Sequence, residues 1–289
     1  MSAAGAIVPA TGMTDLAGFH PAAREYLRAV VDALSGAELA SLVVFGSAAR
    51  GGFSDAVSDV DLIVVLADGA AAVERARTQA RVAALEVAHG LTEERAAEGR
   101  LEAFVGRAGG NTLSCFVCTR SDLLSGSVAR VLGLRPHEAA LVDRIVFASI
   151  IGSGRTVWGE DLLPHVPVPP IRRLDVFKAL FGFLNLLALI AASYGVLPNA
   201  TRHAMGALKR SLHSCYFCYH LRTDALDREV AFFIERLGDS GTLRELLALR
   251  AEYRDSPGFV LRCAPAILRL HLAAARENRF PRAIAAGGR

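Results

Sequence analysis

The pattern of apolar and polar positions divides the chain into two parts with different periods. In the first part, valine- and leucine-rich runs at residues 39–45 and 60–66 are bounded by Gly, Ser and Asp, which is typical of buried strands. Segments with apolar residues at helical spacing alternate with these runs. We expect further strands at residues 112–119 and 154–158, and helices at residues 21–34, 70–88 and 141–151.

Beyond residue 170 every segment has a helical period. Four prolines between residues 164 and 170 predict a linker before this part. The sequence therefore predicts an α/β (α+β) domain with a mixed sheet at residues 21–163, a Pro-rich linker at 164–170 and an all-α helical-bundle domain at 171–289. Residues 1–20 lack the charged start and long apolar core of a secretory signal, and we expect them to form a flexible tail.

One long apolar stretch raises the question of whether the protein spans a membrane. Residues 179–197 carry no charge, and 19 residues is close to the minimum length of a membrane span. Asn185 and two glycines interrupt the stretch, and Pro198 ends it. We interpret it as a buried helix at the centre of the bundle, and we expect no membrane partner.

Composition and charge narrow the class of protein. The 289 residues are 52% apolar and 21% charged, which excludes a disordered chain. The net charge of +3 conceals an uneven distribution, because residues 1–168 carry −5 and residues 169–289 carry +8. This favours an anionic partner between the two parts, although scattered surface charges would give the same total. Five irregularly spaced cysteines indicate reduced thiols and a cytoplasmic protein.

The segment that suggests chemistry joins the strand at residues 39–45 to the next strand through Gly46-Ser47 and Asp59-Val60-Asp61. Strand side chains alternate faces, so Asp59 and Asp61 point to the same side, about 7 Å apart. Such a pair stays ionised when a cation lies between its members, and oxygen ligands suit Mg²⁺. Gly46 lets the backbone approach a phosphate, and Ser47 can donate to it. The alternative is an ordinary turn and a solvent-facing Asp pair.

These residues resemble the signature of the nucleotidyltransferase superfamily typified by DNA polymerase β. The form Gly-Ser-x-x-Arg-Gly, followed by Ser-Asp-x-Asp-Leu, is most similar to minimal and antibiotic nucleotidyltransferases. The resemblance implies that Gly46 and Ser47 hold the triphosphate of an NTP and that Arg50 lies beside it. It also implies that Asp59 and Asp61 are catalytic and bind Mg²⁺ or Mn²⁺.

A third carboxylate is common in that family, as a metal ligand or as the general base for the acceptor hydroxyl. The clear strand at residues 112–119 contains no acid. Glu102 is a substitute if its segment is a strand, and Asp122 lies just past a strand end. Without such an acid, metal coordination alone could deprotonate the acceptor, or the domain could bind nucleotide without fast chemistry.

Lys209 is the residue of the helical part that we single out. His213, Tyr216 and His220 follow it at helical spacing and share one stripe with it. A cationic and aromatic stripe that faces the acidic part could hold a triphosphate or stack a base, and the alternative is a solvated helix flank. The pairs Cys115/Cys118 and Cys215/Cys218 suggest zinc, but neither has a turn inside it, so we interpret them as buried apolar residues.

Together these features predict a divalent-metal-dependent transfer of a nucleoside monophosphate from an NTP to an acceptor hydroxyl, with release of pyrophosphate. The acceptor is a small molecule or a polymer. A nucleic acid is not favoured, because no continuous basic stripe with interleaved aromatic residues is evident. The alternative is a degenerate domain that binds nucleotide in a regulatory role. The sequence leaves a homo-oligomer open.

Overall fold

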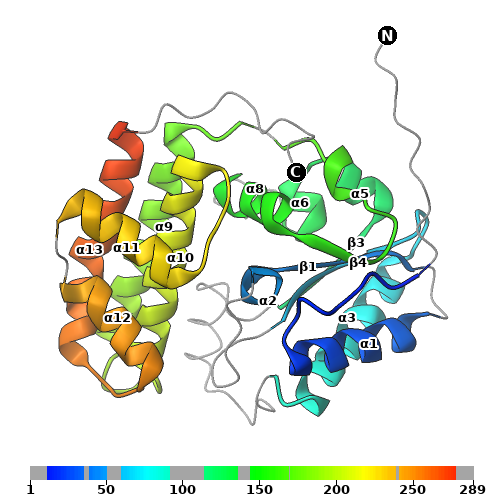
Figure 1. Cartoon of the computed structure of the whole chain (residues 1–289), viewed down its shortest axis with the longest axis horizontal. Coiled ribbons are helices and arrows are strands. Elements are labelled where there is room, and N and C mark those ends of the chain that lie inside the picture. The colour runs from blue at the N-terminus through cyan, green and yellow to red at the C-terminus, as the bar shows by residue number, and fades with distance from the viewer. Residues whose placement is uncertain are drawn as a thin grey trace.

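The computed structural model describes residues 12–35, 39–50, 60–91, 114–135, 144–168, 170–238 and 241–277. Within them, a four-stranded sheet with its helices forms one part of the molecule, and long helices form the other (Figure 1). The strands are β1 (Leu39–Phe45), β2 (Asp61–Leu66), β3 (Cys115–Thr119) and β4 (Arg155–Gly159). The expected fold class is confirmed.

The sheet is mixed, as expected, with the strand order β3-β2-β1-β4. β1 is antiparallel to both of its neighbours, whereas β2 and β3 are parallel. A parallel pair needs a crossover connection, and α3 (Ala72–Ala88) lies in the chain between these two strands. Because β1 and β2 are antiparallel, the start of β2 lies beside the end of β1, where the Gly46-Ser47 turn follows.

Both faces of the sheet are covered, which explains why β2 is an almost continuous apolar run. One face packs against α1 (Pro21–Leu34) and α3, and the other against α5 (Arg120–Leu124), α6 (Val128–Val131) and α8 (Arg144–Ser153). Leu62 and Val64 belong to the first core, and Ile63 and Val65 belong to the second.

Two short helices begin directly at strand ends. α2 (Gly46–Arg50) begins at Gly46, so Ser47 lies inside its first turn. α5 is capped by Thr119, because the Thr119 hydroxyl accepts a hydrogen bond from the backbone N–H of Asp122 at 3.2 Å. The segment that contains Glu102 lies outside the described residues.

The helical part is built around α10. Its helices are α9 (Arg173–Ala192), α10 (Ala200–His220), α11 (Leu226–Leu237), α12 (Gly241–Ala251) and α13 (Pro257–Glu277). α10 packs against α9, α11 and α13 and contributes a long row of buried residues to their common core. The short helix η1 (Leu163–His165) lies at the start of the linker predicted at residues 164–170. The limits predicted for the two domains stay a prediction.

α8 joins the two parts, because its side chains belong to two cores. Ile145 and Ala148 pack into the helical core, whereas Phe147 and Ile150 pack under the sheet. α8 also contacts both α2 and α10. This shared helix holds the turn that follows β1 close to α10, although the two segments lie about 160 residues apart in the sequence.

The apolar stretch at residues 179–197, expected to be a central buried helix, lies in α9 as far as Ala192, and only one face of this helix is buried. Val176, Leu180 and Leu187 pack into the helical core, whereas Phe177 and Phe181 are exposed. Among the described residues, α9 and α13 are long and apolar enough to cross a membrane by length and composition alone. The core helices of globular proteins share this property.

We predict that Gly159→Ala destabilises the sheet. Gly159 has φ 76°, and an added Cβ would collide with the backbone carbonyl of Ala40 on β1. Gly90 has φ 65° with no atom close to an added Cβ, so Gly90→Ala reports the backbone strain alone. We expect the control to cost ~1–2 kcal/mol and Gly159→Ala ~1–3 kcal/mol more in the free energy of unfolding. Urea denaturation measures both, and equal losses would contradict the collision.

Candidate active site

The turn after β1 lies directly against the first residue of β2. Phe45 pairs with Asp61 across the antiparallel strands, so Gly46 is the next residue beyond that pair. Gly46 has φ 73°, and a Cβ at this position would overlap Oδ2 of Asp61. Glycine is therefore required here for its backbone conformation and for the close approach of a carboxylate.

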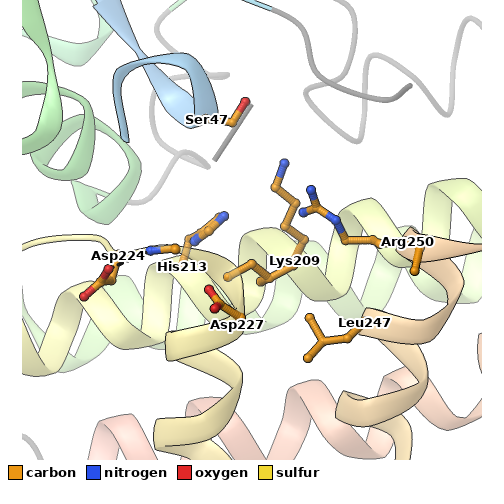
Figure 2. Close-up of a pocket in the computed structure, with 10 residues that line it drawn as sticks. Ser47, Lys209, His213, Asp224, Asp227, Leu247 and Arg250 are labelled. Carbon is orange, nitrogen blue, oxygen red and sulfur yellow. Dashed lines mark hydrogen bonds between the residues drawn. The ribbon is translucent and has the colours of Figure 1, made fainter. Parts of the chain in front are cut away.

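A pocket of about 280 Å³ separates this turn from the helical part (Figure 2). Ser47 lines one side from α2, and residues of α10, α11, α12 and the segment before α11 line the other. The lining residues are Ser47, Lys209, His213, Asp224, Ala225, Leu226, Asp227, Leu247, Arg250 and Ala251. The pocket therefore depends on the docking of the two parts through α8.

The charges in the pocket are arranged with opposite signs on different sides. Lys209 and Arg250 extend toward Ser47, while Asp224 and Asp227 lie farther from it (Figure 2). Partial burial lowers the pKa of the Arg250 guanidinium, and no carboxylate among the described residues pairs with it. A half-buried cation in this position would be stabilised by an anionic ligand.

His213 is held in place by a buried carboxylate. Its Nδ1 lies 2.5 Å from Oε2 of Glu229, and the side chain of Glu229 is completely buried. Oε1 of Glu229 accepts a hydrogen bond from the backbone N–H of Asp224 at 3.0 Å. The imidazole itself borders the pocket between Asp224 and Lys209 (Figure 2).

The stripe that the sequence predicts on α10 divides into two environments. Lys209 and His213 line the pocket. Tyr216 and His220 lie outside its lining, with their ring centroids 4.2 Å apart and both rings against Phe232. Burial and nearby arginines lower the pKa of His220. Of the four residues in the stripe, only Lys209 and His213 therefore lie where they could contact a ligand in this pocket.

The structure describes only part of the predicted phosphate and metal site. It places Gly46, Ser47 and Asp61 together and brings Lys209 to the same pocket as Ser47. Asp59 lies outside the described residues, and so does the side chain of Arg50. The roles assigned to all of these residues stay predictions.

One described carboxylate fits a divalent cation. Asp61 projects over the Gly46 backbone at the turn, and a carboxylate with phosphate oxygens is the donor set that Mg²⁺ prefers. No group of three or more His, Cys, Asp or Glu side chains that could hold a metal occurs in the part of the chain that the structure describes. Asp61, with the predicted Asp59, would therefore need the substrate to complete the coordination.

Cys115 and Cys118 lie in cores on opposite faces of the sheet, so they do not form one side of a zinc site. Burial raises the pKa of both thiols to about 12, which keeps them protonated and unsuited to metal binding.

Asp122 is excluded as the third carboxylate of the site. Parallel pairing places Cys115 beside Leu62 and Thr119 beside Leu66, so Asp122 follows the far end of β3 from Asp61. Five strand residues span about 16 Å. Asp122 instead accepts from the Arg75 guanidinium at 3.2 Å. Glu102 lies outside the described residues.

Several residues that border the site are not predicted from the sequence. Arg250, Asp224 and Asp227 line the pocket, but no periodic pattern connects them with residues 46 and 47. Glu229 left a signal that could have been used, because it shares the buried face of α11 with Val230 and Phe233. An acid on an apolar helix face usually has a specific partner.

Comparisons with known proteins give the following matches. Residues 24–97 match the sequence model of the nucleotidyltransferase domain. No curated protein matches the chain significantly. Among solved structures, the chain is similar to the spectinomycin adenyltransferase AAD(9) of Enterococcus faecialis, solved with ATP and spectinomycin. The identity is 11% and the TM-score 0.49, over 86% of this chain and 97% of that one.

Proposed function

Because the chain carries a nucleotidyltransferase domain at residues 24–97, we propose that it transfers a nucleoside monophosphate from an NTP to an acceptor hydroxyl. The observation that carries the proposal is the pocket between Ser47 and the cationic side chains of α10 and α12. An NTP bound there would place its triphosphate between the two parts of the molecule. Pyrophosphate is the second product.

The residues on the cationic side of the pocket would bind the β- and γ-phosphates. Lys209 and Arg250 supply positive charge, and the Ser47 hydroxyl supplies a hydrogen-bond donor. Asp61 and Asp59 would hold Mg²⁺ or Mn²⁺ beside the Gly46 turn. A bound divalent cation neutralises charge on the phosphoryl oxygens. The protein groups orient the α-phosphorus for in-line attack by the acceptor.

The acidic side of the pocket indicates which chemical class of acceptor would bind. Asp224 and Asp227 would attract amino groups and repel the phosphates of a nucleic acid. This supports a small, amino-substituted alcohol as the acceptor. None of the five cysteines forms a disulfide and all are buried, which supports a reducing compartment such as the cytoplasm.

The test is incubation of the protein with Mg²⁺ or Mn²⁺, each labelled NTP, and a panel of amino-sugar and aminocyclitol alcohols, RNA and protein acceptors. We expect label to move to a small acceptor, together with pyrophosphate. Transfer to RNA that falls steeply with salt would contradict the small-acceptor assignment. NTP binding without transfer to any acceptor would contradict the enzyme and favour a regulatory nucleotide-binding protein.

A further inference from the structure

We propose that His213 is the general base that removes the proton of the acceptor hydroxyl, and that Glu229 is its positioning residue. The inference rests on the proposed transfer reaction and assigns one step of it. It supplies the base that neither β3 nor Asp122 provides, because β3 has no acid and Asp122 lies at the far end of that strand.

Contacts made by Glu229 set the orientation of the imidazole. Both carboxylate oxygens are used, one by Nδ1 of His213 and the other by the backbone N–H of Asp224. A carboxylate that accepts from Nδ1–H fixes the tautomer in which Nε2 carries the lone pair. The ring borders the pocket, and in that tautomer Nε2 is the nitrogen that can accept a proton.

The burial of Glu229 makes a purely structural role costly. The residue comes from α11, where Val230 and Phe233 are also buried, and its side chain is completely buried. Burying an ionised carboxylate costs several kcal/mol unless it is paired and hydrogen-bonded. A hydrophobic residue at this position would pack without that cost, so the carboxylate is best explained by what it does to His213.

The groups around His213 favour a role as a base over a role as a phosphate ligand. Lys209 on the same helix and Arg250 on α12 already supply two cations toward Ser47. From α11 and the segment before it, Asp224, Asp227 and Glu229 face the pocket or the ring. His213 thus lies between the cationic side and the acidic side, where the hydroxyl of an acceptor would meet the α-phosphate.

The proposed step is balanced as follows. The acceptor oxygen forms a bond to the α-phosphorus while its proton moves to Nε2 of His213. The bond between the α-phosphorus and the bridging oxygen breaks, and pyrophosphate leaves with that electron pair. The imidazolium is stabilised by the Glu229 carboxylate until it returns the proton to solvent.

Transfer kinetics of His213→Gln and Glu229→Gln test the inference, with His220→Gln on the same helix as the control. We expect His213→Gln to lower kcat by about 10²–10³ and to leave the KM for NTP within about twofold. The wild-type rate should fall at low pH as the imidazole becomes protonated, and this acidic limb should be absent in His213→Gln. Glu229→Gln should shift the limb, and His220→Gln should retain it.

A second readout does not require turnover. Nitrogen-15 NMR of the histidine side chains in the full chain should find neutral His213 protonated on Nδ1, and Glu229→Gln should reduce that preference. A proton on Nε2 would overturn the inference, as would a His213→Gln variant with unchanged kcat and acidic limb, or with a raised KM alone. If Asp61→Asn abolishes transfer while His213→Gln does not, only the base role is wrong. If wild type transfers to no acceptor, the proposed function is wrong and the base role with it.

Discussion

Asp61→Asn is expected to lower nucleotidyl transfer by about 10³ or more while leaving the fold intact. The carboxylate lies against the Gly46 backbone at the end of β1, where the triphosphate and the cation are proposed to bind. An asparagine keeps the shape but removes the charge, and loss of metal-based charge stabilisation costs several kcal/mol in the transition state, which is about 10³ in rate. Labelled-product formation under saturating NTP measures the effect.

The matched control is Asp122→Asn, at the opposite end of the neighbouring strand. Asp122 pairs with Arg75 and accepts a hydrogen bond from the backbone N–H of Thr119 at the start of α5, so its loss should affect stability more than catalysis. We expect its kcat/KM per folded molecule to stay within about threefold of wild type, because the substitution removes only a weak, partly exposed ion pair that lies away from the proposed site. A large activity loss in Asp122→Asn, or none in Asp61→Asn, would contradict the site.

Lys209→Met is expected to raise the KM for NTP by about 10–100-fold. The ammonium extends from α10 toward Ser47, and a charge-assisted hydrogen bond to phosphate contributes ~1.5–3 kcal/mol. The chain offers an unusually clean control, because Lys178 is its other lysine and lies on α9 outside the pocket lining. Lys178→Met should leave KM unchanged.

Amine-selective labelling of the wild-type protein gives an independent measurement of the same contact. Bound NTP should protect Lys209 from acylation and leave Lys178 reactive, since only the first is proposed to contact phosphate. Equal reactivity of Lys209 with and without saturating NTP would contradict the contact.

The strands and helices near the turn were predictable because their apolar runs are short and clearly bounded. The helix at residues 21–34 and the strand at residues 39–45 match the structure at both ends. β2 was readable as a strand, although its pattern alone did not reveal that Ile63 and Val65 face a second covered side. Helix starts were harder, because Thr119 and Ser121 are both competent caps and only the geometry of the strand end selects Thr119.

The site was predictable only where local sequence determines it. Gly46 and Asp61 meet because a hairpin-like antiparallel pair brings them together, which the motif spacing already implies. The other side of the pocket depends on α8 packing into two cores, and no local pattern encodes that docking. Lys209 and His213 could be found from their common stripe, whereas Arg250 on α12 could not.

Phosphorus-31 NMR of a reaction that contains wild-type protein, Mg²⁺, an NTP and an amino-substituted alcohol follows the proposed transfer itself. We expect equimolar pyrophosphate and a new phosphodiester that joins the nucleoside monophosphate to the acceptor, both absent with Asp61→Asn. Release of nucleoside diphosphate, or a phosphodiester that still forms with Asp61→Asn, would contradict the proposed reaction.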